Sequence, residues 1–206
     1  DVHLSVEGLK RITEPVDILD RDAFEKELNE LGSLRAKADA IRTRLAKSIN
    51  TKYQENPAYY ENFSKRIKEA LELYKARTIT EAEYLAKMRD ILEDYRTGKS
   101  AIAYPDRIRA NVHAQAFYGV LTAIFSNEKL SVEPDFAAEM ARDITTIIEK
   151  HSQVDWTHNL TIHDRISQDI DDLFYRYQKE MGLVLSFDVI DMIIENVKTV
   201  ALRRFA

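Results

Sequence analysis

Apolar side chains recur at intervals of three or four residues along most of this chain, the spacing that gathers side chains on one side of an α-helix. Leu34, Ala38, Ile41, Leu45 and Ile49 show it in one run. The 206 residues include only 5 Gly and 4 Pro, too few breaks for a turn-rich β fold. The pattern predicts an all-α fold of about eight helices in an irregular bundle, after a poorly defined N-terminal segment.

Local signals mark the ends of the expected helices. Thr80 and Glu83 form a capping-box pattern that opens one helix, and Gly98 closes it. Pro105 suits the first turn of a helix, residues 161–164 form a second capping-box pattern, and the apolar stripe of the last helix begins with Phe187. The helices are expected at about 21–31, 34–53, 57–77, 81–97, 106–126, 134–151, 162–181 and 187–205.

The chain divides into three segments by composition. Residues 1–20 are an irregular lead-in or the tail of a preceding domain, because Gly8 and Pro15 interrupt any periodic pattern. Residues 21–98 are a helical, basic segment and residues 99–206 a helical C-terminal core, with a single domain over 21–206 as the alternative. The chain begins at Asp1 rather than Met, so we expect a piece of a longer protein.

Several chemistries are excluded or disfavoured. The chain has no Cys, which rules out disulfides, cysteine-ligated zinc and thiol catalysis. It lacks glycine-rich phosphate loops, a serine-nucleophile elbow and the HExxH zinc motif. His158 and His163 are five residues apart, a poor spacing for two ligands on one helical face. No apolar stretch is long enough to span a membrane. We therefore expect no catalytic residue, metal site or bound cofactor here, and no membrane contact.

Charge is distributed unevenly along the chain. The net charge is −5, but residues 34–77 carry eleven basic and five acidic side chains and are therefore at +6. Such helix faces lie along phosphates without reading bases, since each contact releases counterions; an ordinary solvated helix face is the alternative. The candidate DNA-binding residues are Arg35, Lys37, Arg42, Arg44, Lys47, Lys52, Lys65, Arg66, Lys68, Lys75 and Arg77.

The single Trp lies in a polar connection between two expected helices. Trp156 follows Asp155, and Arg165 is the nearest candidate cation for that carboxylate. Trp and Arg are common anchors of protein interfaces, so these three residues form a candidate protein-interaction site. The alternative is that the Trp packs over the edge of the core with its N–H bonded.

Three motifs in order resemble the C-terminal region of the R (motor) subunit of type I restriction–modification enzymes. The helix at 62–77 carries the family's Phe-Ser start, Tyr and Arg as Phe63, Ser64, Tyr74 and Arg77. Residues 114–121 are similar to its Phe/Tyr-rich central helix. Residues 154–157, followed by Arg165, are similar to its Asp-Trp…Arg element. The resemblance covers about 40–206; residues before 40 are not matched.

The resemblance implies a longer subunit with a nuclease domain and two motor domains upstream of this region. Such a subunit would use ATP and Mg²⁺ to pull double-stranded DNA past a methyltransferase complex before cutting it, in the cytoplasm of a bacterium or archaeon. This region would be its non-catalytic helical end, which docks the motor domains of the same chain onto the modification and specificity subunits and holds the DNA backbone. The runner-up is a helical protein–protein adaptor with no DNA role.

Overall fold

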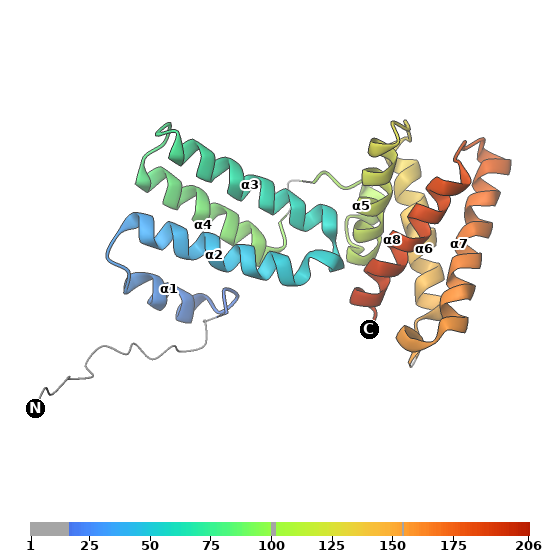
Figure 1. Cartoon of the computed structure of the whole chain (residues 1–206), viewed down its shortest axis with the longest axis horizontal. Coiled ribbons are helices and arrows are strands. Elements are labelled where there is room, and N and C mark those ends of the chain that lie inside the picture. Colours follow the sequence, from blue (N-terminus) through green and yellow to red (C-terminus); the bar gives the residue numbers. More distant parts are fainter. Residues whose placement is uncertain (1–16, 100–101, 154) are drawn as a thin grey trace, which may run out of the picture.

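The computed structural model describes residues 17–99, 102–153 and 155–206, and within these ranges it contains eight α-helices and no strand. The predicted all-α fold is therefore confirmed (Figure 1). Most of the expected lead-in, residues 1–16, lies outside the described residues. The helices are α1 (Arg21–Asn29), α2 (Leu34–Lys52), α3 (Pro57–Lys75), α4 (Glu81–Thr97), α5 (Val112–Asn127), α6 (Pro134–His151), α7 (Leu160–Met181) and α8 (Phe187–Arg204). Three short 3₁₀ turns are η1 (Tyr53–Glu55), η2 (Asp106–Ile108) and η3 (Trp156–His158).

A side chain caps the N-terminus of seven of the eight described α-helices. The capping box at α4 is complete, because the Thr80 amide donates to the Glu83 carboxylate at 2.7 Å and the Glu83 amide donates to the Thr80 hydroxyl at 3.2 Å. The Thr80 hydroxyl also donates to this carboxylate, and the two hydrogen bonds from Thr80 to the carboxylate lower the pKa of Glu83. Gly98 ends α4 at φ 70°, a conformation that favours glycine.

Three local predictions were wrong. The helix expected directly after Pro105 begins only at Val112, because η2 intervenes and the Asn111 side chain accepts the first free amides of α5. Asn159 caps α7 in place of the expected capping box at 161–164. Phe187 is 85% exposed, since it is the first residue of α8 and precedes the stripe that faces the core.

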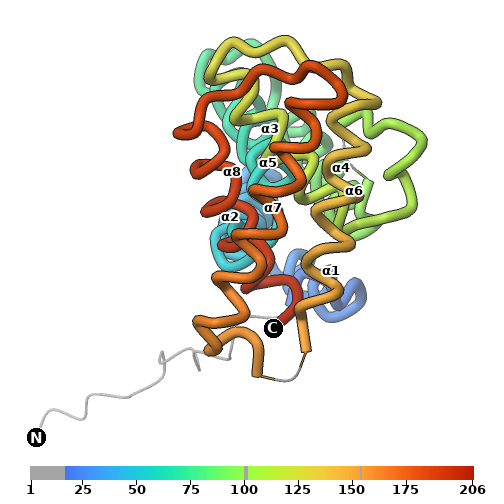
Figure 2. The backbone as a smooth tube through the Cα atoms, turned by 90° about the vertical axis from the view of Figure 1, so that its right-hand side faces the viewer, coloured from blue at the N-terminus to red at the C-terminus, as the bar shows by residue number. Residues whose placement is uncertain are grey.

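The buried apolar side chains form two separate clusters. One lies within α1–α4 and includes Phe24, Phe63 and Tyr84. The other lies within α5–α8 and includes Phe117 and Phe174. Figure 1 shows the two helix groups side by side along the long axis, and Figure 2 looks along that axis, with the α5–α8 group in front. We call them the first and the second helix group.

Helix α5 connects the two groups. It is buried nearly all round, as its continuous apolar sequence predicts, and it packs against α6 and α8 within its own group and against α3 of the first. The approach to α3 is close, because a Cβ atom added at Gly119 would lie 2.7 Å from the Cβ of Ala58. Glycine at 119 therefore sets how near the two groups can come.

Replacing Gly119 with Val should destabilise the protein by about 1–3 kcal/mol, because the added side chain overpacks the contact with α3. Gly32→Val is the matched control, since nothing lies within 4 Å of its added Cβ, and it should change stability by about 0.5 kcal/mol or less. Urea unfolding followed by circular dichroism measures both. Equal stability of the two variants would show that the approach at Gly119 is not tight.

Candidate nucleic-acid and protein interfaces

The candidate DNA-binding cations of α2 lie on two flanks of the helix. Arg35 and Arg42 are seven residues apart and share one flank, while Lys37 and Arg44 share another. The Arg35 guanidinium lies 6.0 Å from the ring centre of Tyr74 on α3. Arg44, in contrast, donates to the Glu27 carboxylate of α1 at 2.7 Å. One flank thus faces α3 and the other faces α1, so the α2 cations do not all gather on one face.

Six of the eleven predicted cations pair with a carboxylate. Five of these pairs have N···O distances of 2.6–3.9 Å and the sixth is at 4.0 Å. The pairs are Arg35 and Arg42 with Asp39, Arg44 with Glu27, Lys65 with Glu69, Arg66 with Asp94, and Lys68 with Glu72. Three of the five acidic residues within 34–77 therefore lie beside its basic side chains, and Glu27 and Asp94 reach them from outside the segment.

Two of these pairs hold helices together. Arg44 with Glu27 and Arg66 with Asp94 are the least exposed ion pairs of the set, at 22–30% for each side chain. Arg66 donates to Asp94 on α4 at 2.6 Å, and its guanidinium lies 5.5 Å from the ring centre of Phe63. Such partly buried, directional pairs contribute more to stability than exposed ones. Arg44 and Arg66 are therefore first of all packing residues.

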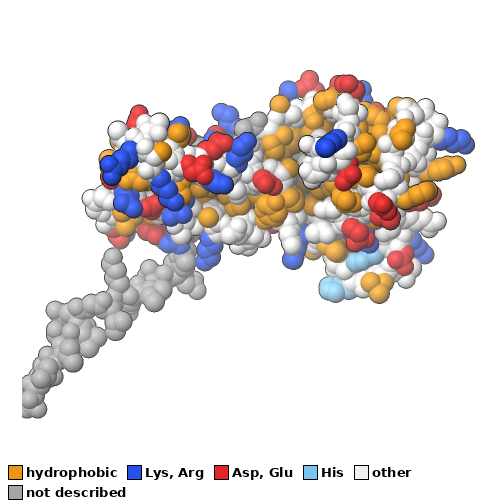
Figure 3. All heavy atoms as spheres, turned by 45° about the horizontal axis from the view of Figure 1, so that its top comes forward, with side chains coloured by type: hydrophobic (Ala, Val, Ile, Leu, Met, Phe, Trp, Pro, Cys, Tyr) orange, Lys and Arg blue, Asp and Glu red, His pale blue; other side chains and the backbone are white. Residues whose placement is uncertain are grey.

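The other five predicted cations form no ion pair among the described residues. Of these, Lys47, Lys75 and Arg77 are exposed, whereas Lys37 and Lys52 are partly buried. The face drawn in Figure 3 shows Lys and Arg side chains at several places over the first helix group, with Asp and Glu side chains between them. These five side chains can meet an external anion without first losing an internal partner.

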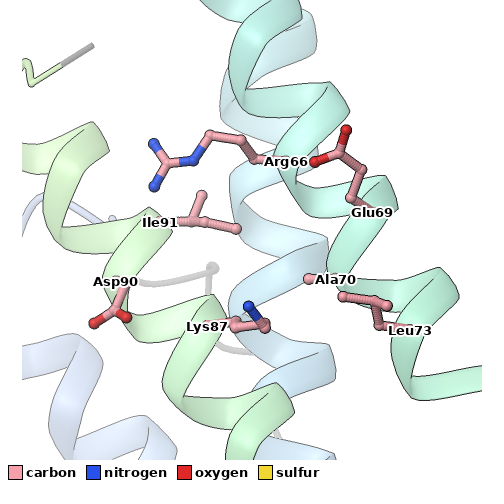
Figure 4. A pocket seen from close by; sticks show the side chains of 7 residues that line it. All are labelled: Arg66, Glu69, Ala70, Leu73, Lys87, Asp90 and Ile91. Atoms are coloured by element: carbon pink, nitrogen blue, oxygen red, sulfur yellow. The ribbon is translucent and has the colours of Figure 1, made fainter. Parts of the chain in front are cut away.

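A shallow hollow of about 230 Å³ lies between α3 and α4 (Figure 4). Its aliphatic surface comes from Ala70, Leu73 and Ile91, and charged groups of both signs stand around it. Lys87 of α4 is one of these groups, and the sequence prediction missed it because it lies beyond residues 34–77, where the basic side chains are most frequent. The charged lining consists of Arg66, Glu69, Lys87 and Asp90.

Trp156 packs inside the fold. Its side chain is 3% exposed, and its indole N–H donates to the carbonyl of Phe205 at 3.0 Å. The packing alternative therefore describes this residue, and Asp155 and Arg165 are the exposed members of the candidate interaction site. Asp155 has φ 61° and makes no ion pair with Arg165 within the part of the chain that the structure describes. Val154, the first residue of the motif, lies outside that part.

Titratable groups on α6 and α7 are engaged with one another. The Asp169 carboxylate binds the His151 ring at 2.8 Å and the Lys150 ammonium at 2.9 Å, and these contacts lower the pKa of Asp169. The Tyr177 hydroxyl donates to Asp143 at 2.7 Å, and burial raises the pKa of Tyr177. Among the described residues, no group of three or more His, Asp or Glu side chains is placed to hold a metal ion.

These features define a class of protein: a helical domain of two packed helix groups with unpaired surface cations on the first. The chain belongs to the family described as "Type I restriction enzyme HindI endonuclease subunit-like, C-terminal", whose model matches residues 6–201. The resemblance to the C-terminal region of an R subunit is thereby confirmed. No helix within the described ranges is long and apolar enough to cross a membrane.

A relative in Haemophilus influenzae is the Type I restriction enzyme HindI endonuclease subunit. The two sequences are 25% identical over 127 residues, which is 62% of this chain and 12% of that subunit. The matched segment thus spans about an eighth of the relative's length. No solved structure matches the chain.

Removing a cation that pairs with a neighbouring helix should lower the stability of the protein more than removing a cation that has no ion pair. Arg66→Ala should destabilise the protein by about 1–3 kcal/mol, because it leaves the Asp94 carboxylate without its partner. Lys75→Ala is the control on the same helix and should be within about 0.5 kcal/mol of the unaltered protein. Thermal and urea unfolding measure both. If the two variants were equally stable, the Arg66 pair would not be holding α3 to α4.

Proposed function

We propose that this region is a non-catalytic docking and DNA-binding domain of a type I restriction enzyme endonuclease subunit. In this proposal it contacts the backbone of double-stranded DNA without reading sequence, and it assembles the subunit with the methyltransferase. The nuclease and motor chemistry, with ATP and Mg²⁺, belongs to domains upstream in the same chain. Family membership supports the placement in such a subunit; the surface of the domain supports the two binding roles.

The observation that carries the DNA role is the set of five cations with no carboxylate partner among the described residues, namely Lys37, Lys47, Lys52, Lys75 and Arg77. A cation that is already paired gains little from a phosphate, because it must give up an existing contact first. An unpaired surface cation contributes through the release of counterions from DNA. Binding of this kind positions the duplex and is independent of its sequence.

Charge reversal at two exposed members of this set tests the DNA role. In the assembled enzyme, Lys47→Glu with Lys75→Glu should weaken binding to DNA lacking a recognition site and lower the slope of log K against log salt by about 2, since two phosphate contacts are lost. Fluorescence anisotropy over a series of salt concentrations gives both quantities.

Lys129→Glu with Lys179→Glu is the matched control, because both residues are exposed lysines of the second helix group. It makes the same change in net charge and should leave the slope unaltered. An equal loss of affinity in the two double variants would mean that only net charge matters. Unchanged binding in the first would remove the DNA role.

Large apolar side chains exposed at the connection from α7 to α8 support the assembly role. Met181 is 57% exposed, Val184 83% and Phe187 85%. Clusters of exposed apolar residues of this kind are typical of protein interfaces. Acidic residues stand beside them at Glu180 and Asp188. We therefore assign this connection to contact with the methyltransferase, at an apolar pocket with a basic rim.

In the full-length subunit, Val184→Ser with Phe187→Ser should lower affinity for the methyltransferase at least tenfold while ATP hydrolysis by the isolated subunit stays the same. Leu160→Ser is the control, since Leu160 is 75% exposed but lies at the opposite end of α7. Analytical ultracentrifugation measures assembly. Normal assembly of the double variant would place the docking surface elsewhere.

The second candidate is a helical protein–protein adaptor with no DNA role. The pairing of six predicted cations with carboxylates favours it, because such pairs are common on solvated helix faces. An adaptor would be retained on an acidic protein column but not on DNA at the same ionic strength, whereas the proposed domain is retained on DNA.

A further inference from the structure

The end of α8 reaches from the second helix group to the first. The guanidinium of Arg204 donates to the carbonyl of Glu55, in the turn η1 of the first group, at 3.1 Å. It also donates to the carbonyl of Val112 on α5 at 3.0 Å. Its Nε lies 3.4 Å from Nδ1 of His113. One planar side chain therefore binds acceptors from both groups, which suits the fork of donors in arginine.

The residues on either side of Arg204 add contacts on the same surface. Arg203 donates to the Gln54 side chain at 2.9 Å, and the Phe205 ring lies 4.4 Å from that of His113. The carbonyl of Phe205 accepts the indole N–H of Trp156 at 3.0 Å. The single Trp of the chain thus holds this segment in place from the side of the second group.

A connecting segment and helix packing also join the two groups. Residues 102–111 of the connection between α4 and α5 contain only the three-residue turn η2. Helix α3 meets α5 beside Gly119, and η1 meets α8. Arg203 and Arg204 add side-chain hydrogen bonds across this junction, to Gln54 and to the carbonyl of Glu55.

We propose that Arg203, Arg204 and Phe205 form a latch that fixes the orientation of the two helix groups, and that protonation of His113 releases it. Neutral His113 accepts from Arg204 at Nδ1, with its proton on Nε2, whereas protonated His113 has no free lone pair and repels the guanidinium. A change in this latch alters the angle between the surface cations of the first group and the α7–α8 connection of the second.

The charged surroundings of His113 set the direction of the pH dependence. Burial and Arg204 lower the pKa of His113, and Glu149 opposes them. Arg204 itself is faced by Glu55, Tyr60 and Tyr104. The pKa of His113 in the folded protein lies below its ordinary value of about 6.5. The latch is therefore fully closed above pH 6.5 and is lost as the pH falls through the lowered pKa of His113.

Because these 206 residues contain no Cys, two spin labels can be attached to introduced cysteines without competing thiols. Spin labels at Ala86→Cys on α4 and Gln168→Cys on α7, both exposed positions, report the distance between the groups in this 206-residue chain. The unaltered latch should give a narrow distance distribution at pH 7.5. Arg204→Ala should broaden it at least twofold, and Arg142→Ala, the control at an exposed arginine of α6, should not.

Two further variants cover the case in which Arg204→Ala fails to fold. Arg204→Lys keeps the charge but cannot reach both carbonyls, so it should broaden the distribution to an intermediate extent. His113→Gln stays neutral and should keep the distribution narrow as the pH is lowered from 7.5 through the acid range, whereas the protein with His113 broadens. A narrow distribution in the Arg204 variants, or the same pH response with and without His113, would overturn the proposal.

Discussion

The close packing of α5 against α3 is the constraint on which the arrangement of this protein depends. Each helix group buries its own apolar cluster, and α5 contributes to one cluster while it packs against α3 of the other group. Gly119 allows that approach, and the contacts of Arg204 secure it from the end of α8. Two small cores thereby form one elongated body (Figure 1).

Ion pairing decides which basic residues are available to a ligand. Arg44 and Arg66 form ion pairs with neighbouring helices. Lys47 and Lys75 are exposed and form no ion pair among the described residues. A count of charges along the sequence treats all of them alike. The three-dimensional pairing reduces the candidate DNA-binding set from eleven residues to five.

Features that depend on neighbours in sequence could be predicted, and features that depend on distant partners could not. Helical periodicity and the capping box at Thr80 act within a few residues, and both predictions were right. Phe187 fits a helical stripe but is the first residue of its helix, so its side chain faces solvent. The partners Arg66 and Asp94 are 28 residues apart, and Arg204 and Glu55 are 149 apart. No local pattern records such contacts.

Lysine footprinting of the assembled enzyme tests the central claim most directly. Acetylation rates of individual lysines, measured with and without DNA, report which ammonium groups a duplex covers. The account predicts that DNA protects Lys37, Lys47, Lys52 and Lys75 severalfold, while Lys129 and Lys179 are acetylated at the same rate in both states. Equal rates with and without DNA at Lys47 and Lys75 would contradict it.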